Sequence, residues 1–226
     1  MDEEIAILNL ARPVLVTGTP LNKANAAMVM IHGRGASASD MLSLVPALNT
    51  SGFAYLAPEA PGHQWYPRPF TAPLEANEPY LSASLALIGE ILSYLAKANL
   101  SAERTILLGF SQGACLSLEY AARNAKRYGG IVGLSGGLIG PDGLERADGG
   151  SLNGSPVFFG CSDVDPHIPA YRVTQAGDYL RRLGGSVTVR FYPRMGHTVN
   201  DDEITFVRSF MAAIRPETSK DSENGR

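Results

Sequence analysis

The stretch TILLGFSQGACLSLEYAAR, residues 105–123, decides the predicted fold. It begins with an apolar run typical of a strand, and its later part is rich in alanine and leucine, as a helix would be. Residues 109–113, Gly-Phe-Ser-Gln-Gly, join the two and match G-x-S-x-G, the pattern of a sharp turn that exposes a serine. The flanking glycines leave room for a strained backbone at Ser111. We therefore predict strand, turn and helix, with Ser111 as a nucleophile.

The same pattern occurs a second time at residues 133–137, Gly-Leu-Ser-Gly-Gly. This copy also follows a predicted strand, but the next residues are Leu-Ile-Gly-Pro-Asp-Gly, which cannot open a good helix. We interpret Ser135 as the structural end of a strand. A tight turn with a capping serine would also explain the glycines around Ser111, although it would not explain the partner residues described below.

Apolar runs and amphipathic stretches alternate along the rest of the chain. Strands are predicted at Val14–Thr17, Ala26–His32, Phe53–Ala57, Thr105–Gly109, Gly130–Leu134, Pro156–Cys161 and Val187–Tyr192, and helices at Ser39–Leu48, Pro79–Ala98, Gln112–Asn124, Pro169–Leu183 and Asp201–Ile214. This alternation predicts the α/β class, with a mostly parallel central sheet of about seven strands flanked by helices. We expect one domain over residues 1–216, no large lid domain, and a disordered polar tail over residues 217–226.

Composition limits the kinds of partner. The 226 residues are 45% apolar and 18% charged, with a net charge of −3. Lysines and arginines are scattered, which argues against nucleic-acid binding and against stable membrane association. A small-molecule substrate is the simpler expectation, and a homodimer is compatible with this composition.

Cysteine usage and the first residues indicate the compartment. The chain has two cysteines, Cys115 and Cys161, which we expect to be buried thiols rather than part of a disulfide framework. The sequence starts with Met-Asp-Glu-Glu, which is acidic where a signal peptide is basic, and there is no apolar run of about 18 residues. These features predict a cytoplasmic protein.

Residues 32–35, His-Gly-Arg-Gly, follow the predicted strand Ala26–His32. A glycine-rich loop in this position supplies one backbone N–H to an oxyanion hole, and the residue after the nucleophile supplies another. We therefore expect the backbone N–H groups of Arg34 and Gln112 to be the donors, and the Arg34 side chain to be solvated. His32 is interpreted as a residue that orients this loop by bonding to the backbone.

The chain order serine, acid, histidine predicts the partners of Ser111. His197 follows one strand, and Asp163 and Asp165 follow another, so all three come at the carboxyl ends of strands. His197 would take the serine proton, and an aspartate would fix the imidazole tautomer. Either aspartate could serve at this stage. The four histidines are widely spaced, so we expect no metal site.

Together these motifs resemble the phospholipase/carboxylesterase family of α/β-hydrolases, which includes acyl-protein thioesterases, over residues 26–214. The resemblance implies the α/β-hydrolase fold, no cofactor, and hydrolysis of esters or thioesters with short to medium acyl groups. It favours Asp165 as the acid, because that residue precedes Pro166 as in the family's Gly-x-x-Asp-Pro-x-Val-Pro-like segment. The loop here is two residues longer than that pattern, which keeps Asp163 as an alternative.

The long aromatic loop after residue 61 suggests a substrate pocket. We predict that Trp65, Tyr66 and Phe70 wall an apolar pocket, together with His167 and Ile168, with packing of the loop against the sheet as the alternative. The predicted function is a serine carboxylesterase acting on small to medium acyl or aryl esters. An acyl thioesterase, a lysophospholipase and a non-catalytic ligand-binding protein of the same fold remain as alternatives.

Overall fold

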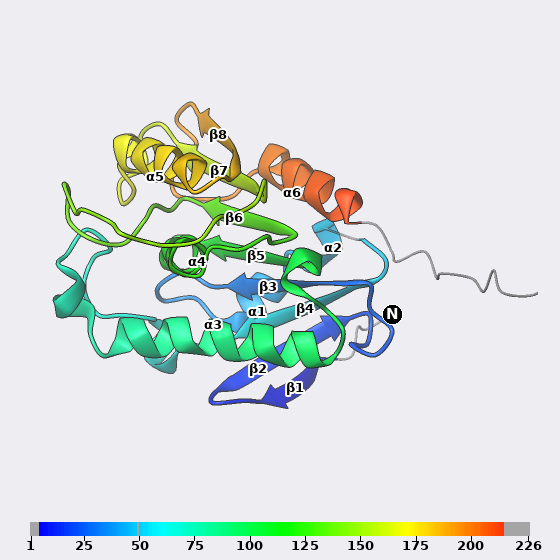
Figure 1. The fold of residues 1–226 in the computed structure, drawn as a ribbon. Coiled ribbons are helices and arrows are strands. Elements are labelled where there is room, and N and C mark those ends of the chain that lie inside the picture. Colours follow the sequence, from blue (N-terminus) through cyan, green and yellow to red (C-terminus); the bar gives the residue numbers. More distant parts are fainter. Residues whose placement is uncertain (1–4, 49, 215–226) are drawn as a thin grey trace, which may run out of the picture.

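The computed structural model describes residues 5–48 and 50–214, so the predicted tail at 217–226 lies outside the described residues. One sheet runs through the molecule in the order β1-β2-β4-β3-β5-β6-β7-β8 (Figure 1). Its strands are β1 Ala6–Asn9, β2 Pro13–Gly18, β3 Ala26–Ile31, β4 Phe53–Pro58, β5 Thr105–Phe110, β6 Gly130–Leu134, β7 Pro156–Ser162 and β8 Ser186–Tyr192.

The sheet confirms the predicted α/β class and adds one strand to the expected seven. Strands β3 to β8 are all parallel to one another in the sheet. At one edge, β2 pairs antiparallel with β4, and β1 pairs antiparallel with β2. The sequence analysis did not predict β1, which has only four residues and no buried one. A short, exposed edge strand carries neither a long apolar run nor a hydrophobic alternation that would mark it.

Helices cover both faces of the sheet. They are α1 Ala38–Leu42, α2 Val45–Leu48, α3 Tyr80–Lys97, α4 Gln112–Arg123, α5 Ala170–Arg182 and α6 Asp201–Ala213, with short 3-10 turns at Pro61–His63, Leu74–Asn77 and Ala102–Arg104. The helix predicted at Ser39–Leu48 is two helices. The first ends at Leu42 with Ser43 as its C-cap, and Pro46 lacks the N–H that would have continued it.

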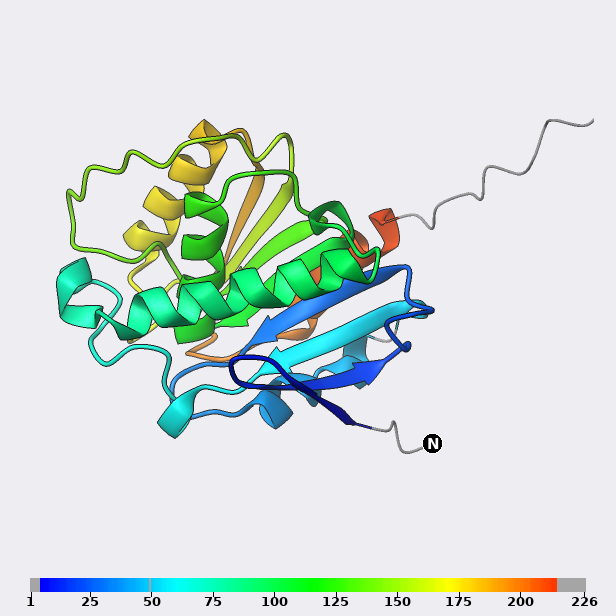
Figure 2. The ribbon, with the colours of Figure 1, turned by 60° about the horizontal axis from the view of Figure 1, so that its bottom comes forward.

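Two buried clusters lie on opposite faces of the sheet. One packs the sheet against α3, α4 and α5, and the other packs it against α1, α2 and α6. Figures 1 and 2 show the same two layers, with the long α3 crossing one face. All residues of β3, β4 and β6 are buried, as expected for strands covered on both sides. No helix within the described ranges is long and apolar enough to span a bilayer.

Strand order reverses between β3 and β5. The chain leaves β3 for β4 on one side and then crosses to β5 on the other, so β3 and β5 are neighbours that lead to opposite halves of the sheet. Ile31 pairs with Gly109, which aligns the carboxyl ends of the two strands. Open α/β sheets bind their ligands at such a reversal. The fold therefore brings the loop at residues 32–35 beside the turn that carries Ser111.

Candidate active site

Ser111 lies on a strained turn between β5 and α4. Its backbone has φ 55° and ψ −117°, a region that side-chain-bearing residues rarely adopt. A Cβ on Gly109 would overlap the carbonyl of Gly113, and a Cβ on Gly113 would overlap the carbonyl of Ile31. The Ser111 N–H donates to the Leu134 carbonyl at 2.9 Å, which ties the turn to the neighbouring strand β6. Close packing at the two glycines and the bond to β6 hold this serine in its unusual conformation.

The second glycine-serine motif forms a similar turn without a following helix. Ser135 has φ 52°, its N–H donates to the Gly160 carbonyl at 2.7 Å, and its side chain is fully buried. A Cβ on the next residue, Gly136, would overlap the Cβ of Ala114 in the first turn of α4. The second motif therefore lies against the helix that follows Ser111, and its own serine is closed to solvent.

Three side chains distant in sequence form a continuous hydrogen-bonded relay. The Ser111 Oγ lies 2.8 Å from His197 Nε2, and His197 Nδ1 lies 2.7 Å from Asp165 Oδ2. The other carboxylate oxygen of Asp165 accepts from the N–H groups of His167 at 2.8 Å and Ile168 at 3.0 Å. A carboxylate can only accept, so Nδ1 carries the imidazole proton and Nε2 accepts from the serine hydroxyl.

Hydrogen bonds keep the buried Asp165 carboxylate ionised. Its side chain is fully buried, and that burial alone would raise its pKa. The hydrogen bond from His197 and those from the backbone N–H groups of His167 and Ile168 outweigh the burial and leave the pKa below its usual value. The site thus holds a negative charge directly behind the imidazole.

Asp163 has a different position. Its Oδ1 accepts from the N–H of Arg194 at 2.8 Å, and Arg194 itself has a positive φ of 52°. Its neighbour Ser162 accepts from the N–H of Gly196 at 3.3 Å. Both contacts lie in the turn that leads to His197. Asp163 therefore holds the loop that carries His197, and Asp165 contacts its ring.

His32 bonds to the backbone, as its sequence position suggested. Its Nδ1 lies 2.7 Å from the Gly33 carbonyl, and its Nε2 accepts from the Ala60 N–H at 3.1 Å. Burial lowers the pKa of this fully buried imidazole, although the bond to Gly33 and the Glu59 carboxylate oppose that effect. A neutral ring with one donor and one acceptor nitrogen matches both contacts.

A cavity of about 510 Å³ opens beside Ser111. That volume is within the range of small-molecule sites. Its walls come from residues 66–70, from the start of α4, and from the two loops that carry Asp165 and His197. The lining residues are Arg34, Tyr66, Pro67, Pro69, Phe70, Ser111, Gln112, Cys115, His167, Ile168 and His197. Four of the five predicted pocket residues are among them.

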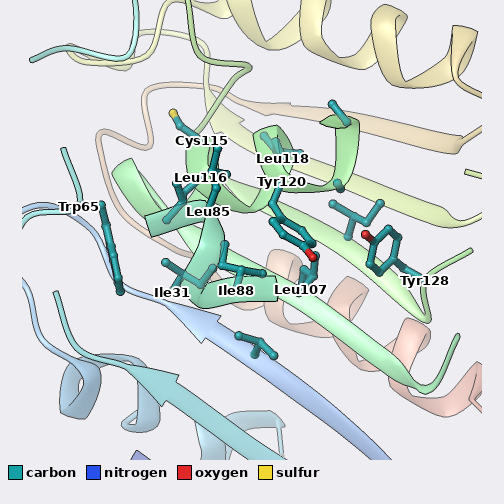
Figure 3. Packing of buried hydrophobic residues seen from close by; sticks show 14 of the residues in the cluster. Ile31, Trp65, Leu85, Ile88, Leu107, Cys115, Leu116, Leu118, Tyr120 and Tyr128 are labelled. Atoms are coloured by element: carbon teal, nitrogen blue, oxygen red, sulfur yellow. The ribbon is translucent and has the colours of Figure 1, made fainter. Parts of the chain in front are cut away.

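Trp65 is the predicted pocket residue that the structure places elsewhere. Its indole N–H donates to the His32 carbonyl at 2.8 Å, and its ring packs on the His32 ring with centroids 4.8 Å apart. Only 2% of the residue is exposed, and Figure 3 shows it at the edge of a buried cluster that also contains Ile31. Contrary to the expectation, Trp65 does not line this cavity, because its indole N–H is turned to the buried His32 carbonyl.

The side chains of Gln112 and Arg34 have roles that the sequence analysis missed. Gln112 accepts from the Trp65 N–H and donates to the Tyr66 carbonyl, both at 2.8 Å. Arg34 is not simply solvated, since its guanidinium donates to Gln64 Oε1 and to the carbonyls of Tyr66, Pro67 and Arg68. The two residues whose N–H groups we expected in an oxyanion hole also hold the cavity wall in place.

Cys115 also lines the cavity without having been predicted. It lies four residues after Ser111 on α4, and its N–H donates to the Ser111 carbonyl at 3.0 Å. Residues four apart on a helix share one face, so this spacing was the available signal. Burial raises the pKa of the Cys115 thiol to about 11, which keeps it protonated and apolar in character.

A serine on a strained strand-to-helix turn, bonded in line to a histidine and an aspartate at the carboxyl edge of a mostly parallel sheet, is the arrangement of the serine hydrolases of the α/β-hydrolase fold. Comparison with known families agrees with this class. The profile of the family described as Phospholipase/Carboxylesterase matches residues 14–215. The chain belongs to that family, and it is a carboxylesterase-family serine hydrolase.

Individual relatives give the same picture. A solved structure of a phospholipase/carboxylesterase from Dyadobacter fermentans is 39% identical, with a TM-score of 0.84 over 89% of this chain and 96% of that one. A carboxylesterase structure from Mesorhizobium loti shares the fold at 20% identity, with a TM-score of 0.76 over 93% of this chain and all of that one.

Curated sequences include an acyl-protein thioesterase 1 from Gibberella zeae, 33% identical over 118 residues, or 50% of this chain and 49% of that protein. The one from Saccharomyces cerevisiae is 32% identical over 48% of this chain and 49% of that protein. In these two matches the chain spans about half the length of the curated relative.

Proposed function

We propose that the protein is a carboxylesterase in which Ser111, His197 and Asp165 form the catalytic triad. The observation that carries the proposal is the relay of two short hydrogen bonds, 2.8 Å from serine to imidazole and 2.7 Å from imidazole to carboxylate. His197 Nε2 removes the hydroxyl proton as Ser111 Oγ attacks the ester carbonyl carbon. The protonated imidazole then gives that proton to the departing alcohol, which leaves an acyl-enzyme.

Water completes the cycle in the proposed mechanism. His197 removes a proton from a water molecule, the resulting hydroxide attacks the acyl carbon, and the Ser111 oxygen leaves with the proton from the imidazole. The carboxylic acid is released and the starting state returns. The Asp165 carboxylate keeps its charge throughout and stabilises the imidazolium that forms in each half.

We assign the oxyanion hole to the backbone N–H groups of Gln112 and Arg34. Gln112 is the first residue of α4, where an N–H has no acceptor inside the helix and the helix dipole favours negative charge. Within the described part of the chain, the Arg34 N–H has no backbone acceptor, whereas its neighbours at positions 35 and 36 do. Each donor in such a site contributes about 3 kcal/mol to transition-state stabilisation.

A serine-directed fluorophosphonate tests the assignment of the nucleophile. We expect the wild type to be labelled at Ser111 and Ser111→Ala to be unlabelled. Ser135→Ala is the matched control, because that hydroxyl is fully buried and closed to the probe, and the variant should label like the wild type. A folded wild type that takes no label and hydrolyses no ester would instead support a non-catalytic ligand-binding protein of this fold.

A second candidate function is hydrolysis of acyl thioesters. It is favoured by the curated relatives, which are named acyl-protein thioesterases. The same relay would serve both reactions, since a thioester presents the same carbonyl carbon to Ser111. A p-nitrophenyl ester chain-length series, run beside an acyl thioester and a lysophospholipid, separates these activities. A kcat/KM for the thioester above that of every oxygen ester would make thioesterase the main function.

A further inference from the structure

Arg34 brings a positive charge to the cavity without an acid to balance it. Its guanidinium donates to the side-chain oxygen of Gln64 and to three backbone carbonyls, all of them neutral acceptors. Across residues 5–48 and 50–214, no carboxylate oxygen lies within 4.0 Å of its nitrogens. The charge of Arg34 therefore remains available to a ligand.

Two other arginines that anchor loops in this protein are paired with acids. Arg146 lies 2.9 Å from Glu119 and 2.8 Å from Asp148, and Arg172 lies 3.3 Å from Asp142. Arg34 holds its loop through neutral oxygens alone, and it lines the cavity beside Ser111.

The guanidinium is fixed in position. Four N–H groups on its two terminal nitrogens contact residues 64–68, and its Nε–H has no acceptor among the residues that the structure describes. A guanidinium held in this way loses little side-chain entropy when an anion approaches. The cavity lining includes no aspartate or glutamate, and the Asp165 carboxylate lies behind the His197 ring.

Arg34 is also next to the point of attack. A Cβ placed on Gly33 would lie 3.2 Å from the Cβ of Ser111, so this loop touches the nucleophile. Arg34 follows Gly33 in this loop and lines the same cavity as Ser111. A charged group on either the acyl part or the alcohol part of a small ester could reach it.

We propose that Arg34 is a specificity-determining residue that favours esters carrying a carboxylate close to the scissile bond. This inference rests on the proposed ester hydrolysis. Arg34 attracts the substrate carboxylate by charge and through its remaining donor, and the apolar side chains of Phe70 and Ile168 receive the uncharged part. Because Arg34 is exposed, solvent screens the attraction and the expected preference is modest.

Two matched ester pairs test this proposal and locate the charge. The butyryl ester of p-hydroxybenzoate, compared with that of p-hydroxybenzamide, places the carboxylate on the alcohol side. The p-nitrophenyl half-ester of adipic acid, compared with p-nitrophenyl heptanoate, places it on the acyl side. The readout is the ratio of kcat/KM for the anionic ester to that for the neutral ester within each pair, corrected for spontaneous hydrolysis.

We expect Arg34→Gln to lower this ratio about five- to tenfold in at least one pair. Arg34→Lys keeps the charge while losing the fork of hydrogen bonds to the loop, and should keep the ratio within about twofold. Arg182→Gln is the control for net charge, since Arg182 lies on α5 and lines a different cavity. Added salt screens the charge of Arg34 and should also lower the wild-type ratio. This measurement uses the wild type alone, so it does not depend on how well Arg34→Gln folds.

A ratio that is the same in the wild type and Arg34→Gln for both pairs, or that falls equally in Arg182→Gln, overturns the proposal. A loss of ratio in Arg34→Lys as large as in Arg34→Gln also overturns it, because the loop contacts and not the charge would then be responsible. Hydrolysis of the neutral esters in these experiments leaves the proposed esterase function intact. Failure of the wild type to hydrolyse any ester or to bind fluorophosphonate overturns that function separately.

Discussion

The side-chain oxygen of Gln112 accepts a hydrogen bond from the backbone N–H of Trp65 at 2.8 Å, across 47 positions of the sequence. The amide nitrogen of the same side chain donates to the Tyr66 carbonyl. Gln112 thus joins the turn that carries the nucleophile to the loop that walls the cavity. The cavity shape and the position of Ser111 are mechanically coupled through this one buried amide.

Replacing Gln112 with alanine should therefore affect both stability and activity. The change leaves the buried Trp65 N–H without its acceptor and leaves the Tyr66 carbonyl with Arg34 as its remaining donor, which costs about 1 to 3 kcal/mol in the free energy of unfolding. The loosened wall should also lower kcat/KM for short acyl esters. Gln112→Glu keeps an acceptor for Trp65 and should lose less stability by chemical denaturation. Equal stability of Gln112→Ala and the wild type would contradict this account.

Exchanging each aspartate for asparagine separates the two acids. Asp165→Asn removes the charge behind His197 and allows the wrong imidazole tautomer, so kcat should fall by about 10⁴-fold. Asp163→Asn still offers a carbonyl to the Arg194 N–H, so its kcat should stay within about tenfold of the wild type. Steady-state kinetics with a p-nitrophenyl ester measure both. A larger loss for Asp163→Asn would assign the orienting role to that residue instead.

Trp65 and Phe70 should respond differently to substitution. Trp65→Phe keeps an aromatic ring but leaves the buried His32 carbonyl without its indole donor, which costs about 1 to 3 kcal/mol of stability. Relative rates across acyl lengths should not change, because Trp65 does not line the cavity. Phe70→Ala enlarges the cavity and should shift the preference toward longer acyl groups. A changed acyl profile in Trp65→Phe would show that the indole influences the cavity from behind.

Glu203 should make folding stability depend on pH near neutrality. Its side chain is fully buried, and burial raises its pKa from the ordinary 4.5 to about 7. Between these two values the folded protein holds a proton that the unfolded chain has lost, so the free energy of unfolding falls as pH rises. The full cost, on the order of 3 kcal/mol, is present above pH 7.

Glu203→Gln removes this titration with little structural change. A glutamine oxygen can still accept from the Asn200 N–H in the capping box that begins α6. The stability advantage of the variant should therefore grow between about pH 5 and about pH 8. Denaturant unfolding at both values measures it. A constant difference would mean that Glu203 is already charged, or already neutral, across that range.

Much of the fold could be predicted because its signals are local. The central strands are continuous apolar runs, the helices follow a clear period, and the chemically active residues come directly after strands. Since the carboxyl ends of parallel strands meet at one edge, Ser111, Asp165 and His197 could be expected to lie close together before any coordinates were known. The structure brings the His197 side chain within hydrogen-bonding distance of both Ser111 and Asp165.

Contacts that depend on how a loop turns could not be predicted in this way. The sequence of the aromatic loop does not say which side of it faces the cavity, so Trp65 and Tyr66 looked alike although one packs on His32 and the other lines the cavity. The contacts of Arg34 and Gln112 with residues 64–68 follow no period, because each joins segments that are separated by about one strand-helix unit. The four-residue β1 lacked a buried face that would have marked it.

The contact between Gly136 and Ala114 has a consequence for protein design. Gly136 of the second motif has no side chain, and the helix after Ser111 packs in the space where one would lie. The two motifs therefore form one packing unit. If only residues 109–113 were grafted onto another scaffold, a residue with a side chain could take the place of Gly136. That side chain would overlap Ala114 in the helix that follows Ser111. An engineered hydrolase built from this turn would need both segments transplanted together, with their neighbouring strands in the same register.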